Sequence, residues 1–253
     1  MIGPDRTEGL HDKAYCGIIS YRKVYFQAST VYFEALSHGK GTGILATRKA
    51  PRKDREKERQ MRAYRDPDYR PEEFERLRET QLAEQDIFHG QILHLRKDTV
   101  RLPNGGTAPR ELIVHVGAVC VVPVTEDGQV YVERQFRYPL GQVITEIPAG
   151  KLDSDTEDIL AAAKRELREE TGLTAERWTE LGLYYPAAAY SDEVITMFLA
   201  QGLHKGTQAL DADEFLDVQL LPMEKLIQDI MAGKVPDGKT QVAVLKAARM
   251  LGR

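Results

Sequence analysis

Three glutamates on one predicted helix are the residues of this sequence whose types and spacing could do chemistry. Glu166 and Glu170 are four positions apart and Glu169 follows Glu166 by three, so their carboxylates crowd one helical face. The C-terminal turn of a helix carries the negative end of its dipole, which disfavours each anion by roughly 0.3–1 kcal/mol. A divalent cation such as Mg²⁺, which binds carboxylate and phosphate oxygens, would neutralise the cluster. The simpler alternative is a solvated acidic face paired with arginines.

The helix that positions these glutamates is predicted to begin near residues 154–156 and to end at Gly172. An apolar stripe at helical spacing is formed by Leu160, Ala163 and Leu167. Ser154 can cap free amides at the start of the helix, and Glu157 can complete a capping box with it. Glycine is the usual residue in the left-handed conformation that ends a helix. The two ends therefore predict a short helix with its acidic cluster in the last turns.

The glutamates belong to a longer pattern, which resembles the Nudix box, G-x5-E-x7-R-E-U-x-E-E-x-G-U with U apolar. The matching residues are Gly150, Glu157, Arg165, Glu166, Leu167, Glu169, Glu170, Gly172 and Leu173. Every spacing fits from Glu157 onward, but six residues instead of five separate Gly150 from Glu157. We expect the loop before the helix to absorb the extra residue without moving the helix.

The region from Ile87 to Leu251 resembles the ADP-ribose pyrophosphatase subgroup of the Nudix family. The resemblance rests on the strings LPNGGTAPRELIVHVGAV, ERQFRYPLGQVITEIPAGKLD, YYPAAAYSDE and DADEFLDV. It implies Mg²⁺-dependent hydrolysis of ADP-ribose to AMP and ribose 5-phosphate, with Mn²⁺ as a second candidate cofactor. Pro186 lies near a proline that the family associates with ADP-ribose specificity. The run 187–189 is Ala-Ala-Ala where the family often has Pro-Gly, which keeps other nucleoside diphosphate sugars open as substrates.

The same resemblance implies roles for individual residues. The implied metal ligands are the backbone carbonyl of Ala149 and the side chains of Glu166 and Glu170, assisted by Glu169 and Glu157. Arg165 would orient the glutamates. Glu214 is the preferred base among the neighbouring acids Asp211, Asp213 and Glu214, and the predicted catalytic residues are Glu214, Glu169 and Arg165. The predicted substrate-binding residues are Arg110, Glu111, Arg137 and Glu146, for each of which an ordinary surface salt bridge is the alternative.

The pattern of strands and helices predicts an α+β sandwich. The resemblance implies that it is a Nudix-type α/β/α sandwich with a mixed β-sheet, preceded by an N-terminal extension. Alternating apolar residues predict strands in IFHGQILHLRKDTVRLPNGGTAPRELIVHVGAVCVVPV, with a turn at 104–106. Further strands are expected in QVYVERQF, VITEIPAG, WTELGLYY, EVITMFLAQGL and FLDVQLLP, and helices at 223–232 and 240–251. Within QVYVERQF, we expect Phe136 to pack in the core.

The first part of the chain is set apart by its composition. We expect residues 1–80 to form an extension and residues 81–253 to form the Nudix domain, including N-terminal strands used in dimerisation. Residues 21–36 could form strands or a short helix, and residues 46–80, dense in both charge signs, an exposed helix or linker. A chain that began at Met61 would keep every motif described above. The resemblance implies a homodimer with exchanged N-terminal strands, in which Arg110 reaches the partner's site.

Composition excludes several other classes of protein. The formal net charge of −4 gives no reason to expect nucleic-acid binding. Cys16 and Cys120 are the two cysteines, which suggests no disulfide framework and a cytoplasmic location. No apolar run is long enough to cross a membrane, and no secretory signal is evident. A remaining alternative from another class is a Nudix module that senses ADP-ribose without cleaving it, although all the box glutamates are present.

Overall fold

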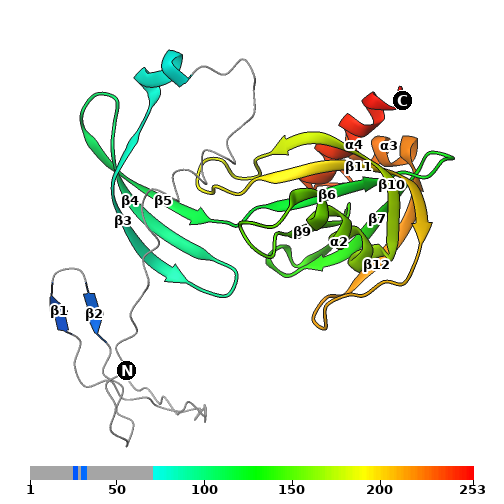
Figure 1. The fold of residues 1–253 in the computed structure, drawn as a ribbon, viewed down its shortest axis with the longest axis horizontal. Coiled ribbons are helices and arrows are strands. Elements are labelled where there is room, and N and C mark those ends of the chain that lie inside the picture. The colour runs from blue at the N-terminus through cyan, green and yellow to red at the C-terminus, as the bar shows by residue number, and fades with distance from the viewer. Residues whose placement is uncertain (1–24, 28–29, 33–70) are drawn as a thin grey trace, which may run out of the picture. The chain divides into compact units, whose positions relative to one another are not determined.

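The computed structural model describes residues 25–27, 30–32 and 71–253 (Figure 1). In the N-terminal unit, β1 (Tyr25–Gln27) and β2 (Thr30–Tyr32) form an antiparallel hairpin. Of the two alternatives for residues 21–36, the described residues are therefore strands. Most of the predicted extension, including Met61 and the charged stretch up to residue 70, lies outside the described residues.

A three-stranded antiparallel sheet follows the short 3-10 helix η1 (Pro71–Leu77). Its strands, in spatial order, are β3 (Thr80–His89), β4 (His94–Arg101) and β5 (Thr107–Val114). The predicted turn joins β4 to β5: Gly105 adopts a left-handed φ of 85° and its amide donates to the carbonyl of Leu102 at 2.9 Å. The amide of Gly106 donates to the side chain of Asn104 at 3.0 Å. The turn at 104–106 is confirmed.

Two further sheets form the body of the second unit. The mixed sheet has the order β10-β11-β6-β9, in which β6 and β11 are parallel and the other neighbours antiparallel. Its strands are β6 (Ala118–Pro123), β9 (Ala149–Lys151), β10 (Leu173–Tyr184) and β11 (Ile195–Lys205). The second sheet has the antiparallel order β12-β7-β8. Its parts are β7 (Gln129–Arg137), the 3-10 turn η2 (Tyr138–Leu140), β8 (Gln142–Glu146) and β12 (Leu216–Pro222).

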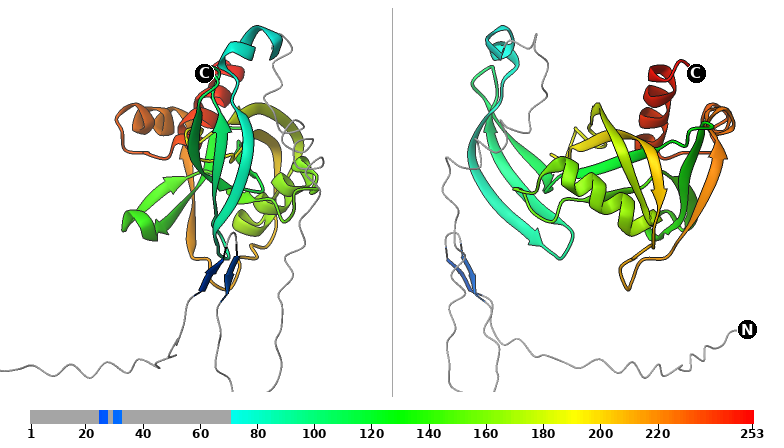
Figure 2. Two further views of the ribbon diagram at one scale, coloured as in Figure 1. Left: turned by 90° about the vertical axis from the view of Figure 1, so that its left-hand side faces the viewer. Right: turned by 45° about the vertical axis from the view of Figure 1, so that its right-hand side comes forward.

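Helices cover both faces of the mixed sheet (Figures 1 and 2). On one face lies α2 (Ile159–Thr171), and on the other lies α4 (Gly238–Met250). The third helix, α3 (Met223–Met231), contacts α4 and the strands β7 and β12 of the second sheet. Successive residues of β6 point to opposite faces, so Val121 joins the core cluster that contains Leu167 of α2, whereas Val122 joins the cluster that contains Val244 of α4. Every residue of β6 is buried, as expected for a strand covered on both sides. The predicted α/β/α sandwich with a mixed sheet is confirmed.

The predicted start of α2 is wrong. The helix begins at Ile159, and its N-cap is Asp158, whose carboxylate accepts from the amide of Ala161 at 2.8 Å. The capping box does not form, because the side chain of Glu157 accepts instead from the amide of Asp153 at 2.6 Å. Asp and Ser are similarly good N-caps, and the chain uses the one nearer the buried stripe. The predicted end is confirmed, since Gly172 is the C-cap with φ 71°.

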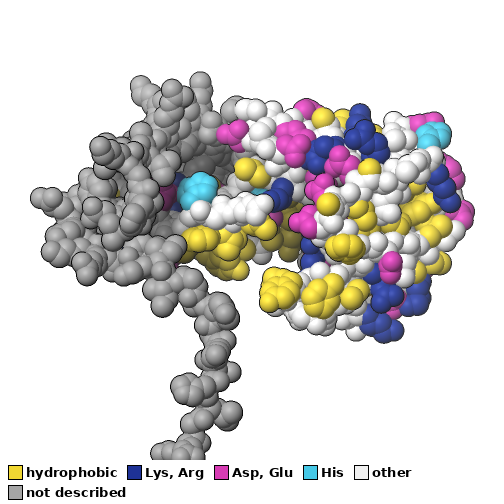
Figure 3. Space-filling model, turned by 90° about the horizontal axis from the view of Figure 1, so that it is seen from below, with side chains coloured by type: hydrophobic (Ala, Val, Ile, Leu, Met, Phe, Trp, Pro, Cys, Tyr) yellow, Lys and Arg dark blue, Asp and Glu magenta, His cyan; other side chains and the backbone are white. Residues whose placement is uncertain are grey.

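The hairpin of β7, η2 and β8 projects from the body (Figure 2, left). The prediction that Phe136 packs in the core is wrong, because Phe136 is 54% exposed. Neighbouring apolar residues are exposed as well: Tyr138, Leu140, Val143 and, from the loop before β12, Phe215. Alternation along the strand allows either face to be the buried one, and here the hairpin extends past the helices that could cover it. Figure 3 shows hydrophobic side chains grouped on the face seen from below.

The cysteine and membrane predictions are tested only within the described residues. Cys120 is a buried free thiol in β6, and burial raises its pKa to about 12. Cys16 lies outside the described residues. No helix in the described parts of the chain combines the length and the apolar composition that crossing a bilayer requires.

Candidate active site

Helix α2 brings two of the predicted metal ligands against strand β9. Glu170 is 4% exposed, and its carboxylate accepts from the amide of Ala149 at 2.8 Å. Glu166, one turn earlier, lies beside Gly150, where an added Cβ would come within 2.1–2.3 Å of the atoms of the Glu166 carboxylate. A glycine at this position is therefore what lets Glu166 lie against the strand. Both glutamates belong to one helix, and Ala149 and Gly150 belong to the strand just before it.

Arg165 orders the acids around α2. Its guanidinium donates to Glu157 at 3.2 Å, Glu166 at 2.7 Å and Glu169 at 3.2 Å, and to the carbonyl of Lys151 at 3.1 Å. Partial burial disfavours its charge, but the hydrogen bonds to the glutamates outweigh this and raise the pKa of Arg165. Four partners fix the side chain more firmly than a single surface salt bridge would. Arg165 therefore ties Glu157 to α2, although six residues separate Glu157 from Gly150.

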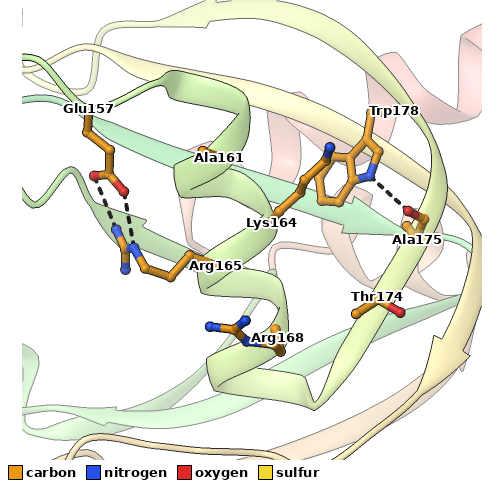
Figure 4. Close-up of a pocket in the computed structure, with 8 residues that line it drawn as sticks. All are labelled: Glu157, Ala161, Lys164, Arg165, Arg168, Thr174, Ala175 and Trp178. Carbon is orange, nitrogen blue, oxygen red and sulfur yellow. Dashed lines mark hydrogen bonds and ion pairs between the residues drawn. The ribbon is translucent and has the colours of Figure 1, made fainter.

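A cavity between α2 and β10 is lined by Arg165 and Glu157 but not by the predicted metal ligands. It has a volume of about 520 Å³. Figure 4 shows Arg165 directed toward Glu157, whereas Lys164 lies beside Trp178 and the indole N–H of Trp178 donates to Ala175. Neither Glu166 nor Glu170 is among the residues that line this cavity. It is therefore a shallow space between α2 and β10 rather than the place where the acids meet.

A second set of charged residues comes from β7 and β8. The buried carboxylate of Glu146 accepts from Arg137 at 2.6 and 2.9 Å, and it also pairs with Lys239. Burial alone would raise the pKa of Glu146, but Arg137 and Lys239 lower it, so this carboxylate is ionised. The side chain of Arg137 remains 40% exposed. An exposed guanidinium edge beside an acidic cluster can bind a phosphate group.

Lys239, at the start of α4, is a site residue that the sequence analysis missed. Asp237 caps α4 by accepting from the amide of Thr240 at 3.0 Å and pairs with Lys239 at 3.1 Å. The hydroxyl of Thr240 accepts from the amide of Ile147 at 2.9 Å. The start of α4 thus holds both the side chain of Glu146 and the backbone that follows it. The sequence Asp-Gly-Lys-Thr at the start of a helix could have identified Lys239, because it places this lysine close to Asp237, the N-cap of the helix.

Glu133 is the second residue that the sequence analysis missed. It lies opposite Glu146 in the register of β7 and β8 and is 3% exposed. Burial, followed by the charges of Glu214 and Glu146, raises its pKa to about 8. Its spacing could have identified it: Glu133 and Arg137 are an even number of residues apart in one strand, so their side chains lie on one face.

Glu214 is the acid of its loop that approaches the cluster. It is half-buried, whereas Asp211 and Asp213 are exposed. Burial, together with the charge of Asp211, raises the pKa of Glu214. Its own charge raises the pKa of Glu166 and of Glu170. A cavity of about 420 Å³ lies beside it, lined by Arg134, Phe136, Val143, Leu210, Glu214, Phe215, Leu216 and Asp217.

Burial and mutual repulsion disfavour ionisation of all the acids in the cluster at once. Burial is the main cause that raises the pKa of Glu170 to about 10, and the charges of Glu133, Glu166 and Glu214 add to it. Burial also raises the pKa of Glu166, although Arg165 opposes the shift.

We tested whether these residues fit a divalent cation. Within the described residues, no three His, Cys, Asp or Glu side chains are already arranged to hold a metal ion. The donor set nevertheless fits one: the oxygens are carboxylate, the glycine at 150 leaves room for Glu166, and one buried oxygen of Glu133 has no hydrogen-bond partner. Hard cations prefer such oxygens, so the acids fit Mg²⁺ or Mn²⁺ in charge and chemistry.

Two predicted substrate-binding residues lie elsewhere in the chain. Arg110 and Glu111 are in β5 of the three-stranded sheet, where both are exposed and Arg110 pairs with Glu79. Within the chain they do not join the acidic cluster. The loop that contains residues 187–189 is held to the end of β5, because Asp192 accepts from the amide of His115 at 2.8 Å.

Comparison with known families and proteins agrees with this site. The family model of the NUDIX domain matches residues 114–241, which include α2 and its glutamates. The chain belongs to the Nudix family. The model of the nucleoside diphosphate sugar hydrolase N-terminal domain matches residues 79–113, which contain β3, β4 and most of β5.

This Nudix chain is similar to curated and solved proteins over most of their lengths. It is 39% identical over 170 residues to the ADP-ribose pyrophosphatase of Bacillus subtilis, covering 66% of this chain and 91% of that protein. It is 32% identical over 166 residues to the ADP-ribose pyrophosphatase of Mycobacterium tuberculosis, covering 65% and 80%. A solved structure titled as an ADP compounds hydrolase has a TM-score of 0.61 at 21% identity, covering 70% of this chain and 96% of that one. At that identity the structure supports the fold alone.

Proposed function

We propose that this Nudix protein hydrolyses the diphosphate of ADP-ribose to AMP and ribose 5-phosphate with Mg²⁺, or alternatively Mn²⁺, as its cofactor. The observation that carries the proposal is the meeting of Glu166, Glu170 and Glu214 beside the half-exposed guanidinium of Arg137. The names of the two ADP-ribose pyrophosphatases that it resembles support the choice of substrate.

Each residue of the site has a separate role in the proposed hydrolysis. A bound divalent cation would neutralise charge on the phosphoryl oxygens and acidify water. The Ala149 amide and the Arg165 guanidinium hold Glu170 and Glu166 in place for it. Arg137, held by Glu146, would bind the diphosphate. Glu214 would accept a proton from the attacking water, because its raised pKa makes it a better base than an exposed glutamate.

A substrate panel with product analysis tests the proposal. We expect ADP-ribose to have the highest kcat/KM among ADP-ribose, ADP-glucose, UDP-glucose and GDP-mannose, and AMP and ribose 5-phosphate to be its products. If ADP-ribose were among the poorest substrates, the assignment would be wrong.

The second candidate is a pyrophosphatase for another nucleoside diphosphate sugar. It is favoured by the name of the N-terminal family and by the run of three alanines at 187–189. The same substrate panel distinguishes the two candidates. If the second is right, another nucleoside diphosphate sugar will have a higher kcat/KM than ADP-ribose. A sensing module that does not cleave would bind ADP-ribose without turnover of any member of the panel.

Glu214→Gln should lower kcat by about 10²–10⁴-fold, the usual contribution of a general base, with a smaller change in KM. The amide cannot accept the proton but keeps the size of the side chain. Glu180→Gln is the matched control, because it makes the same change of charge at an exposed position of β10. We expect the control to change kcat by less than about threefold, as surface substitutions usually do. An equal loss in both variants would remove Glu214 from the role of base.

We propose further that the protein is a cytoplasmic homodimer built by the domain at 81–253, with residues 1–80 as an extension. The strands β3 and β4 support this, because they expose Ile87, Phe88 and, in the loop between them, Ile92 and Leu93. In a dimer, Arg110 would reach the partner's site. Light scattering should give twice the mass of the chain, and a monomeric mass at micromolar concentration would contradict the proposal.

A further inference from the structure

One carboxylate in the site has no function in the mechanism above. Glu133 lies in β7, is 3% exposed, and its Oε1 is the one buried side-chain polar atom without a hydrogen-bond partner among the described residues. Buried polar atoms nearly always have a partner, because leaving one without a partner is costly. The oxygen of Glu133 therefore points to a ligand that completes the site.

The protein cations near Glu133 are already committed to another acid. Arg137 donates twice to Glu146, and Lys239 pairs with both Glu146 and Asp237. Glu146 is the direct neighbour of Glu133 across β7 and β8. Two carboxylates thus share one face of the hairpin, and the available lysine and arginine serve Glu146.

The other groups that face Glu133 are acids. Glu214 and Glu146 are its strongest charged neighbours, and Glu133 is in turn the strongest charged neighbour of Glu170, as the causes of their raised pKa values show. Glu170 comes from α2 and is buried as Glu133 is, so two elements each contribute a buried carboxylate to the cluster. A cation is the ligand that this arrangement would stabilise, because its charge would favour the ionised form of both carboxylates.

We propose that Glu133 is an additional ligand of a divalent cation, which it shares with Glu170 across the space between β7 and α2. This inference rests on the proposed function, in which the site holds Mg²⁺ or Mn²⁺, and adds a ligand from outside the box helix. The cation has the hard, oxygen-binding character that two carboxylates require.

Calorimetric titration of the full chain with Mn²⁺ at neutral pH tests the proposal without measuring activity. We expect Glu133→Gln to weaken Mn²⁺ binding by at least about tenfold, or to remove one bound ion, because a ligand outside the helix is lost. Glu180→Gln, at an exposed position of β10, makes the same change of charge and should bind Mn²⁺ as the wild type does.

Thermal unfolding distinguishes a lost ligand from a damaged fold. In EDTA, Glu133→Gln should melt at the wild-type temperature or above, because a buried carboxylate without a partner has been removed; with Mn²⁺ it should gain less than the wild type. If Glu133→Gln does not fold, Glu133→Val provides the same measurement with a residue suited to a buried strand.

The outcomes separate the two proposals. Binding of Mn²⁺ by wild type and by both Glu133 variants with equal affinity and stoichiometry would overturn the role of Glu133 and leave the metal site in place. Absence of Mn²⁺ binding by the wild type would overturn the metal site itself, and the role of Glu133 with it.

Discussion

Glu170→Gln should lower kcat by at least about 10³-fold, a loss as large as the removal of a preorganised electrostatic group. The carboxylate is held by the amide of Ala149 at 2.8 Å and lies where the other acids converge. Glutamine keeps the size of the side chain but cannot supply an anionic oxygen. The activity should therefore be lost through chemistry and cation binding rather than through folding.

The stability of the same variant should change in the opposite direction. Because burial raises the pKa of Glu170 to about 10, far above that of an exposed glutamate, the folded protein holds a proton there that the unfolded chain releases at neutral pH. The stability that this bound proton provides is fully present below the pKa of Glu170 in the unfolded chain. It is lost as the pH rises through the pKa of Glu170 in the folded protein. In EDTA, Glu170→Gln should thus melt at or above the wild-type temperature, with a gain that grows as the pH rises.

Steady-state kinetics and thermal unfolding of Glu170→Gln, beside the exposed control Glu180→Gln, provide the measurement. The control should retain wild-type kcat and melting temperature. Retained turnover in Glu170→Gln would remove this residue from the metal site. A large fall of its melting temperature in EDTA would instead show that the carboxylate stabilises the fold by itself.

Gly150→Ala should lower activity at limiting Mg²⁺ by about 10–100-fold, the usual effect of disturbing the support of a metal ligand. The added methyl group would come within 2.1–2.3 Å of the Glu166 carboxylate, so that carboxylate must move. The Glu166 carboxylate is the far end of a flexible side chain, so it can move. The φ of Gly150 is not in the left-handed range. The fold should therefore tolerate alanine while the position of Glu166 does not.

The measurement for Gly150→Ala is kcat/KM as a function of Mg²⁺ concentration, with the melting temperature in EDTA as the check on folding. Gly106→Ala is the matched control, because that glycine also lies outside the left-handed range and an added Cβ would meet only the side chains of Asn104 and Leu102. We expect the control to show wild-type dependence on Mg²⁺. An unchanged dependence in Gly150→Ala would mean that Glu166 does not need its position against β9.

The parts of the site that could be predicted from the sequence are those fixed by local geometry. The spacing of Glu166 and Glu170 determines their common face once the helix forms, and Gly172 ends that helix whatever surrounds it. Strand alternation likewise predicted most strands of these sheets, although the one strand predicted in VITEIPAG is two strands, β8 and β9, of different sheets. The exact N-cap of α2 was not predictable in this way, because Ser154 and Asp158 are both suitable caps and the packing of the helix selects between them.

The parts that were missed depend on contacts between distant segments. Glu133 and Lys239 belong to β7 and α4, and only the fold brings them to Glu146 and Glu170. Phe136 was assigned to the wrong face because alternation gives two faces without naming the covered one. That strand is exposed because the hairpin extends beyond the helices. The local sequence pattern does not predict how far the hairpin extends.

The most direct test of the account is hydrolysis of ADP-ribose by the metal-depleted protein, followed by addition of Mg²⁺. We expect no turnover in EDTA, and equal amounts of AMP and ribose 5-phosphate once Mg²⁺ is in excess. Undiminished cleavage in excess EDTA, or no cleavage of ADP-ribose after Mg²⁺ is restored, would contradict it.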